Sequence, residues 1–206
     1  MQPSRHQAVS LSRDCPAVLI PEGSPITLTE GTEVHITQAL GGSVTVLVHG
    51  NLARIAAGDA DAVGLSPDAG SARIDGLNLQ EAVWEVLRTC YDPEIPINIV
   101  ELGLVYGVQL KRLGQSSTAA HVVGADASTP TGPVAGEIRG PGDMRAEVVM
   151  TLTAPGCGMG DVLVDDVRQK LLSLPGVVEA AVELTFDPPW HQGMMSEAAR
   201  LQTGLY

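Results

Sequence analysis

The sequence predicts an α+β protein, in which a small all-β module precedes a two-layer domain of the order α-β-β-α-β. Residues 17–56 contain short runs of β-forming side chains separated by glycine turns, which predicts the β module. From residue 77 onward, apolar residues follow helical and then alternating spacing in the order helix, strand, strand, helix, strand. Residues 57–76 are rich in Gly, Ala, Asp and Ser, and we expect them to be a linker.

The N-terminal part begins with a polar segment, residues 1–16, which we expect to be a tail. The β-rich runs 33–39 and 44–48 flank Gly41-Gly42, a pattern typical of a β-hairpin. With the neighbouring runs, they predict about five short strands. We find no recognisable chemistry in this module.

The second domain, residues 77–206, begins with an amphipathic helix over residues 77–90 that ends before Pro93. Its apolar stripe consists of Leu79, Val83, Val86, Leu87 and Cys90. Alternating residues predict strands over 104–110 and 144–153. Between these strands, residues 113–143 have almost no apolar periodicity, so we expect a flexible insertion.

A second helix and a last strand complete the predicted domain. Four residues form the apolar stripe of the helix: Leu163, Val167, Leu171 and Leu174. The predicted core face of the strand is Val178, Ala180, Val182, Leu184 and Phe186. Because a helix joins the strand over 144–153 to the last strand, these two strands should be parallel. The domain is therefore expected to have a three-stranded mixed sheet with helices on one face.

Composition limits the classes of function. The formal net charge of −12 argues against binding nucleic acids or anionic membranes. Apolar runs are too short for a membrane span, and the first 15 residues lack the apolar core of a signal peptide, so we expect a cytoplasmic protein. The three cysteines are widely spaced and form no CxxC pair, which argues against a disulfide framework and a closed zinc site.

Cys157 is the strongest candidate for chemistry. It lies between a predicted strand and a predicted helix, among Pro155, Gly156, Gly158 and Gly160. The unpaired N–H groups at the start of a helix carry partial positive charge, so a thiol held there should ionise more readily. Thiolate is the form that binds metals or attacks electrophiles. The alternative is a small buried side chain in a glycine turn.

Two other segments are weaker candidates. Asp92 and Glu94 stand in a proline-stiffened segment where carboxylates suit a metal or a partner, although a helix stop with a capped turn is the better explanation of this segment taken alone. Cys90 fits the apolar stripe of its helix and is expected in the core. The tail around Trp190, with its two methionines, is typical of a soft, adaptable surface, and the alternative is that it closes over the core. Ser196 is a candidate cap for a last short helix.

Three of these segments, 92–106, 150–157 and 187–190, together resemble the metal–sulfur cluster assembly domain family. The run 36–43 extends the resemblance to about residues 16–206. Two features depart from the family pattern. One is the insertion over 113–143, and the other is Gly158, where relatives often carry proline. We expect a looser cysteine loop from the glycine.

The resemblance implies a factor for iron–sulfur cluster assembly that is not an enzyme and that transfers clusters to client apoproteins. It implies that Cys157 is a transient cluster and metal ligand, with Asp92 in the family's acidic motif beside it. Clusters ordinarily have four ligands, so one cysteine per chain cannot complete one. The cluster is then shared between subunits, as in a homodimer, completed by an assembly protein or a small thiol, or not held at all.

Two alternatives remain open from the sequence. The first is a metal-free adaptor that links clients to the assembly machinery. The second is a thiol redox protein, which needs a base near Cys157 that the sequence does not identify.

Overall fold

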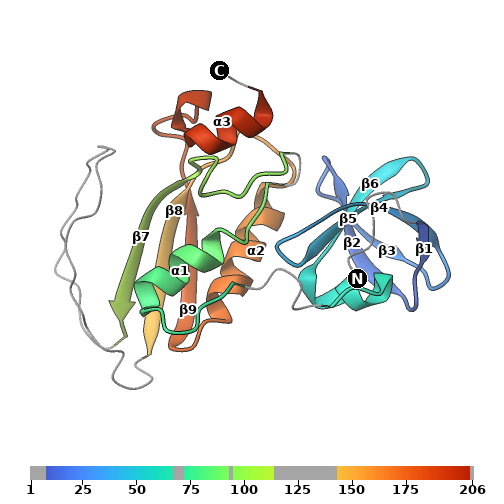
Figure 1. Cartoon of the computed structure of the whole chain (residues 1–206), viewed down its shortest axis with the longest axis horizontal. Coiled ribbons are helices and arrows are strands. Elements are labelled where there is room, and N and C mark those ends of the chain that lie inside the picture. Colours follow the sequence, from blue (N-terminus) through green and yellow to red (C-terminus); the bar gives the residue numbers. More distant parts are fainter. Residues whose placement is uncertain (1–7, 67–71, 93–94, 114–142, 205–206) are drawn as a thin grey trace.

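The computed structural model of the protein describes residues 8–66, 72–92, 95–113 and 143–204. It contains a six-stranded sheet in the N-terminal part and a three-stranded mixed sheet with helices in the C-terminal part (Figure 1). The predicted α+β class, with an all-β module ahead of an α-β-β-α-β domain, is confirmed. Within the described ranges, no helix combines the length and apolar character needed to cross a membrane.

The N-terminal module is an antiparallel sheet with the strand order β1-β4-β5-β6-β2-β3. Its strands are β1 (Ala8–Ser10), β2 (Cys15–Ile20), β3 (Pro25–Leu28), β4 (Glu33–Leu40), β5 (Ser43–Val48) and β6 (Asn51–Ile55). The predicted hairpin around Gly41-Gly42 is the β4–β5 pair. The module has its own core, which includes the buried side chains of Val34, Val46 and Ile55.

Two boundaries of this module differ from the prediction. Strand β1 lies inside the expected tail and pairs with β4, because Val9 and Leu11 pack against the module's core. The 3-10 helix η1 (Ala57–Val63) occupies the start of the expected linker. Its small apolar side chains, such as Ala60 and Val63, are buried in the same core. The composition of Ala, Gly and Asp predicted a linker, but this stretch forms a packed 3-10 helix.

The C-terminal domain consists of α1 (Leu79–Leu87), β7 (Val105–Arg112), β8 (Met144–Met150), α2 (Gly160–Leu172) and β9 (Val177–Leu184), followed by η2 (Gln192–Met194) and α3 (Glu197–Thr203). The sheet order is β7-β8-β9, with β7 antiparallel and β9 parallel to β8, as predicted. Helices α1 and α2 cover one face of this sheet (Figure 1). Asn78 and Glu81 form a capping box that starts α1.

The predicted helical stripes are buried except at Leu79, which is half-buried. Irregular pairing changes the core face of two strands. A register shift beside Tyr106 in β7 lets Val105 pack on the core. Another shift at the start of β9 buries Val177 and leaves Val178 49% exposed, contrary to the prediction. Phe186, beyond the end of β9, is 42% exposed instead of buried.

The expected insertion over 113–143 falls almost entirely outside the described residues. Its two described ends are close, because the amide of Leu113 donates a hydrogen bond of 2.8 Å to the carbonyl of Asp143. This bond extends the β7–β8 ladder by one step.

Candidate functional site

Cys157 lies in the loop that connects β8 to α2, as the sequence predicts. The loop is anchored at both ends by the buried side chains of Leu152 and Met159. The amide of Gly160, the first residue of α2, donates a 3.0 Å hydrogen bond to the carbonyl of Cys157. The Cys157 side chain packs partly against the domain core and remains partly exposed. Part of the Cys157 surface is therefore open to solvent in this arrangement.

The other two cysteines are fully buried. Cys90 follows α1, and its burial raises the pKa of the thiol to about 12. Cys15 lies in β2, and burial likewise raises the pKa of its thiol. Both thiols stay protonated at neutral pH, because burial disfavours the charged form. Cys90 is therefore a core residue, as predicted, and neither thiol suits a metal.

Asp92 is nearly buried, with 6% of its surface exposed. Its carboxylate accepts a hydrogen bond of 2.9 Å from the amide of Ile95, and its own amide donates to the carbonyl of Ile97. This is the capped turn that the sequence offered as an alternative to a ligand. Glu94 lies outside the described residues. A place for Asp92 beside the cysteine remains a prediction of the resemblance.

Asn98 is a structural residue that the sequence analysis missed. Its side-chain oxygen accepts hydrogen bonds from the amides of Val100 (3.1 Å) and Glu101 (2.9 Å), which fixes the turn ahead of β7. Asparagine is common in turns for this reason, so its place in a Pro-rich loop was the available signal.

The three segments that carry the family resemblance meet at residues 102–106. The amide of Thr151 donates to the carbonyl of Leu104 (2.8 Å), which joins the cysteine segment to this stretch. Trp190 Nε1 donates to the carbonyl of Leu102 (2.8 Å), and the Tyr106 hydroxyl donates to the carbonyl of Pro188 (2.8 Å). The tail thus closes over the core, which was one of the two interpretations left open by the sequence, and it ties the three segments into one unit.

The N-terminal module also reaches the cysteine loop. A Cβ added at Gly158 would lie 2.6 Å from the carbonyl oxygen of Glu22 and 2.7 Å from that of Pro21. Both residues belong to the turn between β2 and β3. Gly158, which we expected to loosen the loop, is therefore the point where the loop touches the other module.

Acidic and thiol side chains do not gather into a metal-binding group in the described part of the chain. There, no cluster of three or more His, Cys, Asp or Glu side chains is positioned to hold an ion. Cys157 is thus one candidate ligand, and further ligands from other molecules remain a prediction.

Comparison with known proteins shows that the C-terminal domain matches a known protein family. The model of the family described as "Iron-sulfur cluster assembly protein" matches residues 80–122 and 130–183. This match begins at α1, so the N-terminal β module lies outside it. It includes the whole of β8, the Cys157 loop and α2.

Three curated relatives resemble the chain over most of their own length. The "Fe-S protein maturation auxiliary factor" of Porphyromonas gingivalis is 38% identical over 129 residues, covering 63% of this chain and 94% of the relative. The factor SufT of Staphylococcus aureus is 31% identical over 114 residues, covering 55% and 96%. The factor YitW of Bacillus subtilis is 28% identical over 127 residues, covering 62% and 95%. The C-terminal domain, with Cys157 on its β8–α2 loop, makes this chain a member of the iron–sulfur cluster assembly protein family.

Proposed function

We propose that this protein is an iron–sulfur maturation factor that binds a cluster transiently through the Cys157 thiolate and passes it to client apoproteins. Family membership and the names of the three relatives support a role in iron–sulfur protein maturation. The observation that carries the mechanism is the position of Cys157. It is the partly exposed thiol, at the start of α2, while Cys15 and Cys90 are buried.

A single thiolate per chain suits a transient carrier. Clusters ordinarily have four ligands, so a cluster held by Cys157 shares its other ligands with a second copy, an assembly protein or a small thiol. With few bonds to this chain, the cluster leaves readily when a client supplies its own cysteines by ligand exchange. The proposal thus includes contact with the assembly machinery and with clients, and a homodimer as one way to share a cluster.

The test is anaerobic cluster reconstitution, followed by iron and sulfide analysis and a visible spectrum. We expect the wild type to bind iron and sulfide and Cys157→Ser to bind neither. Cys15→Ala is the matched control, because it removes a buried thiol from the other module and should leave the cluster intact. A cluster that persists in Cys157→Ser, or a wild type that stays colourless, contradicts the carrier mechanism.

A metal-free adaptor is the second candidate, and exposed apolar side chains favour it. Val178, Phe186 and Leu201 of the C-terminal domain are 49%, 42% and 56% exposed. Such side chains suit contacts with another protein. Under this hypothesis, binding of an assembly protein or client survives Cys157→Ser and is lost in Phe186→Ser. Under the carrier mechanism, binding that depends on the cluster is instead lost in Cys157→Ser and survives Phe186→Ser.

Neither candidate requires enzymatic turnover. A carrier exchanges ligands around a cluster, and an adaptor holds two proteins together. We therefore propose a factor without catalytic activity of its own. We also propose that it acts in the cytoplasm, where thiols such as that of Cys157 are kept reduced.

A further inference from the structure

The two modules touch at a few points around a cavity. Each has its own cluster of buried side chains, so neither core depends on the other. A cavity of about 690 Å³ lies between them, lined by residues of both, including Val18 and Ala56 on one side and Val86 and Leu174 on the other. A contact with a cavity inside it buries little apolar surface, and contacts of this kind commonly permit relative motion of domains.

The first contact lies at the cysteine loop. The β2–β3 turn meets Gly158 backbone to backbone, so that a Cβ at Gly23 would lie 2.0 Å from the carbonyl oxygen of Gly158. Gly23 has a φ of +72°, which also favours glycine. A side chain on either glycine would separate these backbones. The fit is specific and adjoins Cys157.

The second contact joins the β4–β5 turn to the end of α1. A Cβ at Gly41 would lie 1.8 Å from the carbonyl oxygen of Thr89, and Gly41 has a φ of +59°. The same carbonyl of Thr89 accepts a hydrogen bond of 2.7 Å from Lys170 Nζ of α2. Lys170 thus fixes the Thr89 carbonyl against which the β4–β5 turn packs.

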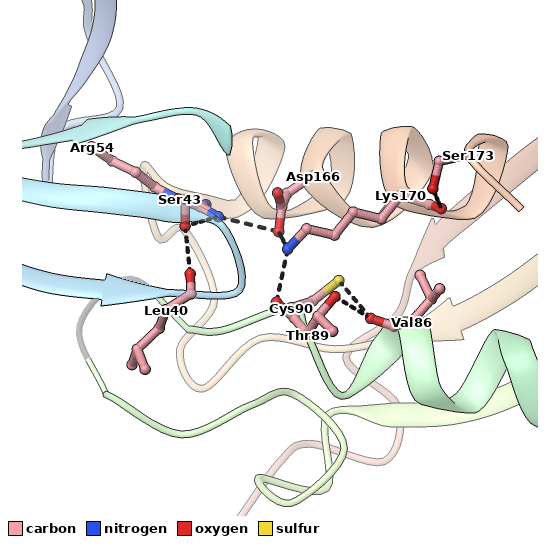
Figure 2. Close-up of polar contacts among 9 residues, drawn as sticks. All are labelled: Leu40, Ser43, Arg54, Val86, Thr89, Cys90, Asp166, Lys170 and Ser173. Carbon is pink, nitrogen blue, oxygen red and sulfur yellow. Dashed lines mark hydrogen bonds and ion pairs between the residues drawn. The ribbon is translucent and has the colours of Figure 1, made fainter. Parts of the chain in front are cut away.

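The third contact is a buried ion pair between the modules (Figure 2). Arg54 of β6 lies 3.1 Å from the carboxylate of Asp166 on α2, and their side chains are 6% and 13% exposed. Lys170 completes the group, with Nζ 3.0 Å from Asp166. Arg54 Nη2 also donates to Ser43 Oγ of β5 (3.2 Å). Removing one partner from a buried pair leaves the other charge uncompensated. The pair therefore stabilises the arrangement in which the two modules are docked, and we call it the latch.

We propose that the N-terminal β module is a built-in cover for the Cys157 loop, latched by Arg54 and Asp166, and that it moves away from α2 to free the loop. Independent cores allow the module to separate without unfolding. Separation hydrates the latch and removes the β2–β3 turn from Gly158. What the freed thiol then binds rests on the proposed function, but the movement itself does not.

The test measures how fast iodoacetamide alkylates Cys157 in the full chain, read from the peptide that contains it by mass spectrometry. Asp166→Asn breaks the latch nine positions along the chain from the cysteine. We expect open molecules to react much faster than closed ones, in which the β2–β3 turn lies against the loop. If about a tenth of the molecules are open in the wild type and about half in the variant, the rate then rises about fivefold. Asp165→Asn is the matched control. Its side chain is 66% exposed and pairs with Arg168 of the same helix, so its rate should stay at the wild-type value.

A second variant tests the same movement at the first contact, where the cysteine loop meets the β2–β3 turn. Gly158→Ala inserts a methyl group against the β2–β3 turn and should raise the alkylation rate and the radius of gyration in solution scattering. Gly107→Ala is its control, because a Cβ at this position in β7 meets no other atom within 4 Å.

The cover is refuted if Asp166→Asn and Gly158→Ala alkylate at the wild-type rate, or if their controls accelerate equally. Tryptophan fluorescence checks that each variant is folded, since both tryptophans lie in the C-terminal domain. If Gly158→Ala does not fold, Asp166→Asn decides the question. Alkylation involves neither cluster nor partner, so its outcome is independent of whether the proposed function is correct.

Discussion

The two modules of this protein place their cysteines in opposite settings. In the N-terminal module, Cys15 of β2 is buried in the core, and in the C-terminal domain Cys157 lies on a loop and is partly exposed. The family match covers residues 80–122 and 130–183, all within the C-terminal domain. The comparison indicates that one module carries the candidate chemistry while the other governs how the cysteine loop is presented. It depends on the two modules being stable units of their own.

The largest expected effect tests that independence. Leu171→Ala removes a fully buried side chain from the C-terminal core, and Ile55→Ala does the same in the N-terminal core. Each should lower the free energy of unfolding of its own module by about 2–5 kcal/mol, through lost burial and the cavity left behind. Denaturant titrations followed by tryptophan fluorescence report the C-terminal domain, which holds Trp84 and Trp190.

The two variants serve as each other's control. Leu171→Ala should move the fluorescence midpoint strongly, and Ile55→Ala should leave it nearly unchanged. Ile55→Ala should instead alter an early change in far-UV circular dichroism, where the β module contributes. Equal shifts of the fluorescence midpoint in both variants would show that the chain unfolds as one unit. That result would contradict both the independent stability of the two modules and the independent movement of the cover.

Sequence reasoning was most successful where one physical pattern dominates. The stripe of Leu163, Val167 and Leu171 in α2 is set by helical spacing alone, and all three side chains are buried as predicted. The parallel pairing of β8 and β9 follows from the helix that joins them, because chain connectivity leaves few arrangements. The position of Cys157 on the loop before α2 followed from the same order of elements.

Predictions failed where the structure depends on a distant segment or on one irregular residue. A register shift at the start of β9 exposes Val178, and strict alternation does not contain such a shift. The role of Gly158 depends on Glu22, more than a hundred residues earlier in the chain, so local sequence could not reveal it.

A medium effect is expected in the pH dependence of the free energy of unfolding, to which the buried thiol of Cys90 contributes. Burial raises the pKa of Cys90 to about 12 in the folded domain, while an unfolded cysteine titrates near about 8.5. The protonated thiol therefore stabilises the fold fully below about pH 8.5, and this contribution falls as the unfolded chain loses its proton at higher pH. Between pH 8 and 10 the loss should be about 2 kcal/mol, measured by denaturant titration with tryptophan fluorescence.

Cys90→Ala is the control for this prediction, because it removes the titrating group from the same position. Its free energy of unfolding should fall less than that of the wild type over the same pH range, by about the amount assigned to the thiol. Tyrosine and lysine side chains titrate in both proteins and cancel in the difference. Identical pH profiles would mean that Cys90 is ionised equally in both states, and the contrast among the three thiols would weaken.

The smallest effect is expected for an exposed ion pair within one module, and the buried latch between the modules provides the contrast. On the open face of the C-terminal sheet, Arg145 lies 3.6 Å from Glu179, and their side chains are 41% and 52% exposed. Water screens such a pair and two flexible side chains must be ordered to form it, so Glu179→Gln should cost less than about 1 kcal/mol in denaturant titration. Asp166→Asn removes a partner from a buried pair and should cost about 3–5 kcal/mol if the modules stay docked. Opening of the cover hydrates Arg54 and reduces that cost, so a small loss of stability together with faster alkylation of Cys157 indicates separation. A large loss without faster alkylation indicates that the latch is a fixed structural contact.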